Sequence, residues 1–380
     1  MDVKLLYNFK LLLDGKEITD QALIIENGRI KEVLPTVTIL KTFSGKTFDF
    51  QNDYLVPGFV DLHVNGGNSH FFTKDLSVEA FDTIYLEHVK RGNTSILPTV
   101  ISTTFENTLK AVEVTRESMR GKEGGMLGLH LEGPYINTLQ KGVHKLDYIR
   151  PPGDDEINEL LRIGDGVIKK MTIAPEFFSA KTIKKITEHG IILSAGHTAC
   201  TVEQALDAFK AGVSCITHIF NAMPSLKGRE PGLVGAALLD DTVYAGIIGD
   251  GQHVKNISIQ LMHKCMQDRL FLVTDATMIG ATDMNLDGVL YYHSKESFVN
   301  EKGDLAGSNI TMHDAVINCV KNGGFSLETA VRMGTEIPMK VMGIKNYGKI
   351  AQGYAADLLR LGKKDLELKS VIKSGKFVSE

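Results

Sequence analysis

The stretch MLGLHLE, residues 126–132, is an apolar run that ends in a carboxylate, and this pattern recurs along the chain. Six residues that can bind a metal or carry a proton fall where a predicted strand ends: His63, Glu132, His197, His218, His253 and Asp275. In a barrel of parallel strands the C-terminal strand ends converge on one face, and that face holds the active site. The six positions together favour a metal-centred hydrolase.

The middle of the chain alternates between predicted strands and predicted helices. The strands cover residues 54–64, 94–100, 126–132, 169–175, 191–197, 214–220, 243–249 and 270–276, with helical patterns at 77–92, 179–189, 201–211 and 254–268. Such alternation implies a parallel sheet, and eight units predict an α/β fold, a (β/α)₈ TIM-like barrel. A doubly wound open sheet is the alternative, but no G-x-G-x-x-G or Walker A loop favours a nucleotide-binding version.

Both ends of the chain have short-strand character instead. Two-residue hairpin signals stand at Asp14-Gly15, Asn27-Gly28 and Ser374-Gly375. Because short strands need several neighbours for stability, we expect residues 1–54 and 345–380 to form one discontinuous β-sandwich domain. Residues 55–344 would then form the barrel.

Composition excludes several classes of function. Over 380 residues, 43% are hydrophobic, 23% are charged and the net charge is -4, which shows no electrostatic footprint for nucleic acid. No apolar run reaches the length of a membrane span, and the N-terminus lacks the features of a signal peptide. Four cysteines without a C-x-x-C pair indicate a reducing, cytoplasmic location.

The chemistry of the strand-end residues points to a metal. Glu132, His197 and His218 offer one carboxylate and two imidazoles, a set that suits zinc or another first-row divalent ion. Three protein ligands leave a position open for water, whose pKa such an ion lowers toward about 7. Asp275 could take the proton and deliver it to a leaving group. His130 shares a strand face with Glu132 and is interpreted as a buried layer residue.

A series of motifs resembles one branch of the amidohydrolase superfamily. The segments are PGFVDLHVNGG (57–67), LGLHLEGPYIN (127–137), KGVH (141–144), SAGHT (194–198), THIFNAMPSLKGREPGLVGA (217–236), GDGQHV (249–254), VTDA (273–276) and LAGS (305–308). In this order they resemble the N-acetylglucosamine-6-phosphate deacetylase family over nearly the whole chain. Dihydropyrimidinases and adenine deaminases resemble this chain only in the features common to the whole superfamily.

The resemblance implies a role for each matching position. Glu132, His197 and His218 match metal ligands, and Asp275 matches the general acid and base. Contacts to the sugar phosphate are implied for Val143, His144, Asn221, Ala222, Arg229, His253, Leu305, Ala306 and Gly307. In this family the arginine reaches the neighbouring subunit's site, so the resemblance also implies a homodimer. A planar guanidinium suits bidentate phosphate binding.

One position departs from the superfamily pattern. Most amidohydrolases open with His-x-His, whereas this chain has His63-Val64-Asn65. Because an amide is a much weaker ligand than an imidazole, we expect one divalent ion per subunit, zinc or iron(II), at the Glu132 site. His63 is then an uncertain ligand of a second site, or a hydrogen-bonding support near Asp275.

The resulting hypothesis is metal-assisted hydrolysis of the N-acetyl amide of N-acetyl-D-glucosamine 6-phosphate in amino-sugar catabolism. The nearest rival substrate is the galactosamine epimer, because the choice between epimers depends on one hydroxyl contact. A cyclic amidase or deaminase is a more distant rival. A non-catalytic sugar-phosphate sensor on the same fold is the rival from another class, although a sensor has no need of Glu132, His197, His218 and Asp275 together.

Overall fold

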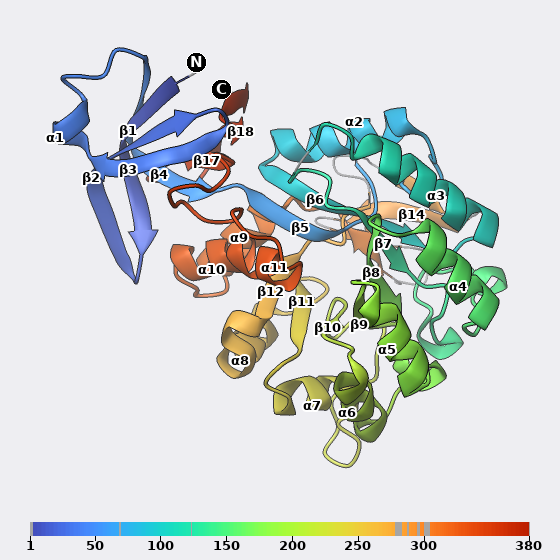
Figure 1. Cartoon of the computed structure of the whole chain (residues 1–380). Coiled ribbons are helices and arrows are strands. Elements are labelled where there is room, and N and C mark those ends of the chain that lie inside the picture. The colour runs from blue at the N-terminus through green and yellow to red at the C-terminus, as the bar shows by residue number, and fades with distance from the viewer. Residues whose placement is uncertain are drawn as a thin grey trace.

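The computed structural model describes residues 3–67, 70–122, 124–277, 283–286, 289–294, 297–299 and 305–379. The chain forms a barrel of eight parallel strands beside a separate sheet built from both ends of the sequence (Figure 1). A third, four-stranded sheet follows the last barrel strand.

The barrel strands pair in chain order, each parallel to the next. They are β5 (Phe59–Val64), β6 (Asn93–Ile101), β7 (Leu129–Glu132), β8 (Ile168–Ile173), β9 (Ile192–Ala195), β10 (Cys215–Ile216), β11 (Tyr244–Ile248) and β12 (Leu270–Val273). The ends of β5 and β12 meet, since the N–H of Asp275 donates to the carbonyl of His63 (3.0 Å) and the N–H of Asn65 to that of Ala276 (2.8 Å). The predicted barrel is confirmed.

Several strands are shorter than the sequence predicted. The largest difference is at β10, which pairs over two residues where 214–220 was expected. The immediate cause is the backbone conformation, because His218 and Phe220 have φ values of 29° and 79°. A strand needs φ near −120°, so the chain leaves the sheet before these residues. Strands β9 and β12 likewise end two residues before His197 and Asp275.

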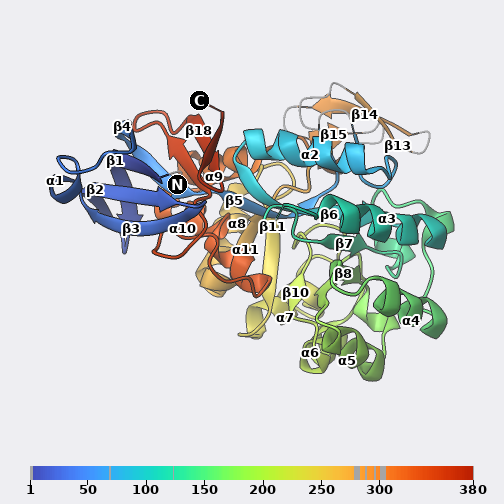
Figure 2. The same ribbon diagram turned by 45° about the horizontal axis from the view of Figure 1, so that its top comes forward.

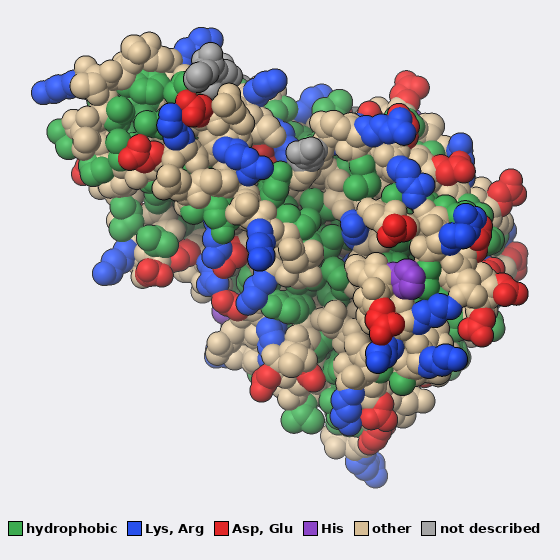
Figure 3. Space-filling model, viewed as in Figure 1, with side chains coloured by type: hydrophobic (Ala, Val, Ile, Leu, Met, Phe, Trp, Pro, Cys, Tyr) green, Lys and Arg blue, Asp and Glu red, His purple; other side chains and the backbone are tan. Residues whose placement is uncertain are grey.

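Helices cover the outside of the barrel (Figure 1). They are α2 (Val78–Lys90), α3 (Phe105–Ser118), α4 (Asp154–Ile163), α5 (Ala180–Glu188), α6 (Val202–Ala211), α7 (Gly232–Leu239), α8 (Asn256–Met266), α9 (Met312–Lys321), α10 (Leu327–Met333) and α11 (Glu336–Val341). The four predicted helices correspond to α2, α5, α6 and α8. No helix in the described part of the chain is long and apolar enough to cross a membrane. On the face seen in Figure 3, basic and acidic side chains are intermixed.

The ends of the chain meet in a seven-stranded sheet. Its strands are β1 (Val3–Leu13), β2 (Lys16–Glu26), β3 (Arg29–Pro35), β4 (Lys46–Pro57), β17 (Leu358–Leu361), β18 (Leu368–Lys373) and β19 (Lys376–Ser379), with the short helix α1 (Thr36–Ile39) after β3. All three predicted hairpin turns are present, each with two consecutive residues at positive φ. Ile30 near one edge and Ile372 near the other share one hydrophobic core. The sheet therefore folds back on itself and encloses its own core.

The sequence did not predict the four-stranded antiparallel sheet between β12 and α9. It comprises β13 (Asp283–Leu286), β14 (Val289–Ser294), β15 (Ser297–Val299) and β16 (Leu305–Ser308). Figure 2 shows β13, β14 and β15 at the side of the barrel that carries α2. Tyr291 and Phe298 of this sheet pack with Phe71, Ile101 and Ala306 in one apolar cluster. The inserted sheet is thus attached to the rim of the barrel.

Candidate metal centre and active site

The six strand-end residues gather at one mouth of the barrel. His63 lies in β5, Glu132 ends β7, His253 follows β11, and His197, His218 and Asp275 stand two residues beyond β9, β10 and β12. The parallel strands point their C-terminal ends at one face, so side chains far apart in sequence become neighbours. This arrangement is the one that the sequence predicted.

Three of these residues adopt backbone conformations that L-amino acids rarely use. The φ values are 48° at His197, 29° at His218 and 53° at Asp275. Such a conformation costs on the order of 1–3 kcal/mol per residue and persists only where the surrounding structure enforces it. Strain of this kind clusters at functional sites, and here it falls on these three residues and on Ala222, another candidate site residue, with φ 50°.

Glu132, His197 and His218 form a compact triangle of ligand atoms. Glu132 Oε1 lies 3.1 Å from His218 Nε2 and 3.3 Å from His197 Nε2, and the two nitrogens are 3.1 Å apart. Three ligands of one tetrahedral zinc ion, each about 2.0–2.2 Å from the metal, lie roughly 3.3–3.6 Å apart. The triangle is close to that size. The residues fit the divalent ion that the sequence predicts.

The hydrogen bond on the other nitrogen of His197 supports this fit. His197 Nδ1 lies 2.8 Å from the carbonyl oxygen of Gln140. A carbonyl only accepts, so Nδ1 carries the proton and Nε2 presents its lone pair to the triangle. His218 Nδ1 is buried and has no hydrogen-bond partner among the described residues.

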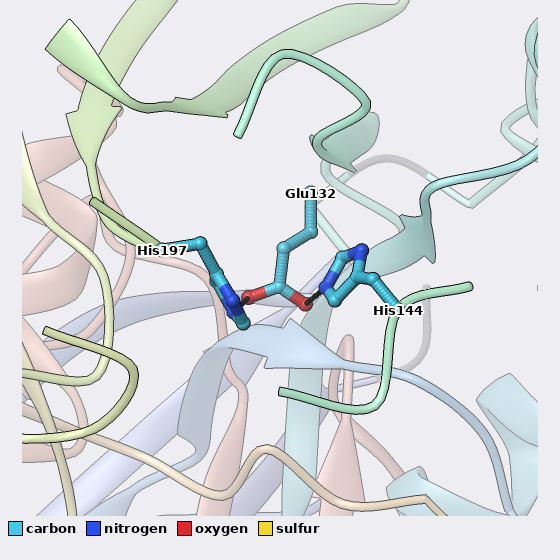
Figure 4. Close-up of side chains that lie close together, drawn as sticks. All are labelled: Glu132, His144 and His197. Atoms are coloured by element: carbon cyan, nitrogen blue, oxygen red, sulfur yellow. Dashed lines mark ion pairs between the residues drawn. The ribbon is translucent and has the colours of Figure 1, made fainter. Parts of the chain in front are cut away.

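His144 approaches the same carboxylate from the other side (Figure 4). Its Nε2 is 3.8 Å from Glu132 Oε2, so Glu132, His144 and His197 also form a possible metal group. However, the backbone N–H of Ser102 donates to His144 Nδ1 (3.2 Å). Burial and the neighbouring His197 hold the pKa of His144 well below its usual value, so the ring is neutral and its proton sits on Nε2. That tautomer presents an N–H donor to the site instead of a lone pair that could bind a metal.

The second oxygen of Glu132 faces a different set of groups. His63 Nε2 lies 3.2 Å from Glu132 Oε2 and 3.1 Å from Asp275 Oδ1. Asn65 Nδ2 donates to the same Asp275 oxygen at 2.6 Å. His63, Glu132 and Asp275 could hold a second ion. Alternatively, His63 is a proton donor between two carboxylates.

The pKa shifts distinguish the two sides of Glu132. Burial opposes the charge on Glu132, but His63 and the contacts with His197 and His218 hold the pKa of Glu132 well below its usual value. Burial lowers the pKa of His218 despite the nearby carboxylate. An ionised carboxylate and neutral imidazoles are the forms that bind metal. Burial alone would lower the pKa of His63, but Glu132 and Asp275 raise it, which favours a proton-donating His63.

His130 anchors the strand that carries Glu132. Its Nδ1 lies 3.0 Å from Thr99 Oγ1 and its Nε2 lies 2.7 Å from Thr172 Oγ1, and it is fully buried. Thr172 Oγ1 is also hydrogen-bonded to Thr217 Oγ1 at 2.7 Å. These hydrogen bonds link β7 to β8 and to the residue that follows β10 inside the barrel. His130 is therefore a layer residue, as the sequence indicated, and it fixes the strand beneath Glu132.

A cavity opens above the triangle. Its lining brings together Glu132, Val143, His144, His197, His218, Asn221, Ala222, His253, Asp275, Ala306 and Gly307 with Asn65, Phe71, Ile101, Gly142 and Thr277. His63 lies buried beside this lining. Phe71, Ile101, Gly142 and Thr277 are residues that sequence reasoning missed. Ile101 and Thr277 each stand one residue beyond a predicted strand, and Gly142 lies within the KGVH motif, so three of the four carried a signal.

Two predicted contact residues are not among the described lining residues. Arg229 is exposed on the loop before α7, outside the described lining of the cavity. Leu305 begins β16, and its side chain lies outside the described residues. Within the site, Asp250 Oδ2 accepts a hydrogen bond from His253 Nδ1 at 2.5 Å. Asp250, which the sequence did not single out, therefore orients His253.

Comparisons with known proteins agree with this geometry. A sequence profile of the amidohydrolase family matches residues 54–378. The N-acetylglucosamine-6-phosphate deacetylase of Haemophilus influenzae is 36% identical over 348 residues, which cover 90% of each chain. The N-acetylgalactosamine-6-phosphate deacetylase of a Shewanella species is 32% identical over 362 residues, 92% of this chain and 91% of that one.

A solved structure is similar over its full length. The crystal structure of N-acetylglucosamine-6-phosphate deacetylase from Pasteurella multocida superposes with a TM-score of 0.94 at 33% identity, and the match covers 100% of both chains. The similarity therefore includes the barrel and the sheet formed by the two ends of the chain.

Proposed function

We infer that this chain, which belongs to the amidohydrolase family, hydrolyses the N-acetyl amide of N-acetyl-D-glucosamine 6-phosphate. The products are D-glucosamine 6-phosphate and acetate, and the reaction serves amino-sugar catabolism. The observation that carries this proposal is the triangle of Glu132, His197 and His218 with Asp275 on the rim of the same cavity. The names of the relatives supply the substrate class.

Members of this family use a divalent metal, and we propose that Glu132, His197 and His218 hold one ion, zinc or iron(II). Bound there, the ion would polarise the amide carbonyl and acidify a water molecule. The ionised Glu132 and the lone pair of His197 Nε2 are prepared for it.

Asp275 moves the proton in this proposal. Its carboxylate takes a proton from the attacking water as the new C–O bond forms at the carbonyl carbon. It then gives the proton to the sugar nitrogen as the C–N bond breaks. Asn65 and His63 both contact Asp275 Oδ1 and fix its position. The donor Nε2–H of His144 and the ring of His253 are available to stabilise the developing oxyanion.

The remaining parts of the site are proposed to bind the sugar phosphate. Asn221 and Ala222 line the cavity beyond β10. Arg229 is exposed and could reach a phosphate in the site of a second subunit, so a homodimer is part of the proposal. We place the barrel domain at residues 55–344, the β-sandwich domain at residues 1–54 and 345–380, and the enzyme in the cytoplasm.

The galactosamine epimer is the second candidate substrate. The specific observation in its favour is the Shewanella relative, a deacetylase of N-acetylgalactosamine 6-phosphate that is 32% identical to this chain. The same cavity and the same catalytic groups would serve either sugar. The epimers differ only in the direction of one hydroxyl group.

The experiment is an assay of acetate release from both sugars, with and without the 6-phosphate, before and after treatment with a chelator. We expect fastest release from N-acetylglucosamine 6-phosphate, loss of activity on chelation, and recovery when zinc or iron(II) is added. A faster reaction with the galactosamine epimer would reassign the substrate. Binding of either sugar phosphate without any acetate release would identify a sensor instead of an enzyme.

A further inference from the structure

One side of the cavity is apolar. We define the apolar wall as Phe71, Ile101, Val143 and Ala306, which all line the cavity. Tyr291 and Phe298 of the inserted sheet pack behind the wall in the same hydrophobic cluster. Phe298 is fully buried, and Phe71 and Ile101 are only 5% and 7% exposed. The wall is therefore a supported part of the barrel rim.

The apolar wall occupies a definite sector of the rim. Phe71 follows β5, Ile101 ends β6, Val143 follows β7, and Ala306 lies in β16 after β12. In the closed barrel β12, β5, β6 and β7 are consecutive neighbours. Other polar lining residues, Asn221 and His253, instead follow β10 and β11. The four residues of the apolar wall thus lie on neighbouring strands, where Asn65, Glu132, His144, Asp275 and Thr277 also line the cavity.

The apolar wall lies beside the reacting groups. In the pairing of β6 with β7, Ile101 stands directly opposite Glu132. Phe71 pairs with Gly66, next to Asn65, whose side chain holds Asp275. A carbonyl carbon placed between the ligand triangle and Asp275 has the wall at its side.

We propose that the apolar wall is the acyl pocket of the enzyme, and that Ile101 limits the length of the acyl group. The inference rests on the proposed function. In an N-acetylated sugar phosphate, hydroxyl groups and a phosphate surround the ring, and the acetyl methyl is the only group without a polar atom. That methyl is bonded directly to the reacting carbon, so it must lie beside Glu132 and Asp275. Burying it against the wall removes apolar surface from water.

Among the residues of the apolar wall, Ile101 is the best placed to limit the length of the acyl group. It ends a barrel strand, so its position is fixed by the pairing of β6 with β7. Its N–H also donates to Thr73 Oγ1 at 3.0 Å. Phe298 and Tyr291 support the wall from behind, so that shortening Ile101 opens space instead of letting the wall collapse. One additional methylene group in an apolar pocket changes discrimination by roughly 10- to 200-fold.

The test compares N-acetyl, N-propanoyl and N-butanoyl glucosamine 6-phosphate in wild type, Ile101→Val and Ile101→Ala. We expect wild type to prefer the acetyl substrate over the propanoyl one by about 10- to 200-fold in kcat/KM. Ile101→Ala should reduce that ratio at least tenfold, and Ile101→Val should lie between the two. The ratio of kcat/KM values is the readout, because a general loss of folded enzyme cancels from it.

Ile96→Ala is the matched control. Ile96 is fully buried in the same strand and belongs to the barrel core, so its truncation costs stability without opening the pocket. It should leave the propanoyl-to-acetyl ratio unchanged. An unchanged ratio in Ile101→Ala, or an equal change in Ile96→Ala, would overturn the acyl-pocket proposal. Wild type that releases no carboxylic acid from any of the three sugars would overturn the proposed function itself, and the two failures are therefore distinguishable.

Discussion

The two oxygens of Glu132 face two chemically different regions. On the ligand side, around Oε1, stand His197 and His218, with nitrogens 3.3 and 3.1 Å away. On the proton side, around Oε2, stand His63 and, through it, Asp275 and Asn65. One side presents a lone pair to an ion, and the other joins hydrogen-bond donors to a second carboxylate.

The comparison shows how one buried carboxylate can divide a site into two halves. The proton on His197 is fixed away from Glu132 by the carbonyl of Gln140. The pKa of His63 is raised by its two carboxylates. In the proposed mechanism, protonation would thus separate a metal-holding half from a proton-transferring half, although both halves contain imidazoles.

Removing a ligand should have the largest effect. His218→Ala leaves two ligand atoms in the triangle, so we expect the variant to lose both its metal ion and its turnover. Elemental analysis and acetate release measure the two losses. Retention of one ion per chain in this variant would mean that the ligand side is not the metal site, and that one of the other two groups, Glu132, His144 and His197 or His63, Glu132 and Asp275, holds the ion.

Asp275→Asn tests the proton side. Asparagine keeps the shape but cannot accept the proton, so kcat should fall by the 10²- to 10⁴-fold typical of acid–base removal or by more, because one residue serves both half-reactions. Metal content and substrate affinity should stay close to those of wild type. Normal kcat would remove Asp275 from the mechanism, whereas loss of the ion would make Asp275 a ligand.

Arg229→Ala tests a contact far from both sides of Glu132. A charge-assisted hydrogen bond is worth roughly 1.5–3 kcal/mol, so kcat/KM for the phosphorylated sugar should fall about 10- to 150-fold. The phosphate is remote from the amide, and its binding energy serves to position the carbonyl. Free N-acetylglucosamine has no phosphate and should show little change.

Two outcomes would count against the phosphate role of Arg229. An equal fall for the phosphorylated and the free sugar would show that Arg229 supports the fold or the dimer. No fall for either would leave its exposed side chain without a part in catalysis. Lys227→Ala, on the same exposed loop, is the matched control for loss of a positive charge.

The gathering of the candidate metal and proton groups at one mouth of the barrel was predictable because each group stands at the end of an apolar strand. A histidine or carboxylate at the end of a buried run is visible in the sequence, and the geometry of a parallel barrel brings such ends together. The predicted strands ran too long at β9, β10 and β12, because the positive φ values at His197, His218 and Asp275 depend on tertiary contacts.

The apolar wall could not be predicted in the same way. Phe71 and Ile101 resemble any other apolar residues, and their grouping depends on Tyr291 and Phe298 from a sheet inserted much later in the chain. The tautomers of His144 and His197 depend on the backbone of Ser102 and Gln140. The hydrogen bond from His253 to Asp250 was not predicted either, although the two residues are only three apart in the GDGQHV motif.

The number of bound metal ions per chain is expected to change least among these predictions. It compares the two sides of Glu132 most directly, because it shows whether one side or both bind an ion. We expect about one tightly bound divalent ion per wild-type chain, because Asn65 donates to Asp275 at 2.6 Å where a two-metal site would want a ligand. Asn65→His should supply that ligand next to His63, Glu132 and Asp275 and raise the content toward two. Elemental analysis of the purified proteins gives both numbers, and Asn65→Ala is the control that removes the amide without adding a ligand. Two tight ions in wild type would show that the proton side already binds metal, and that His63 is a ligand instead of a donor.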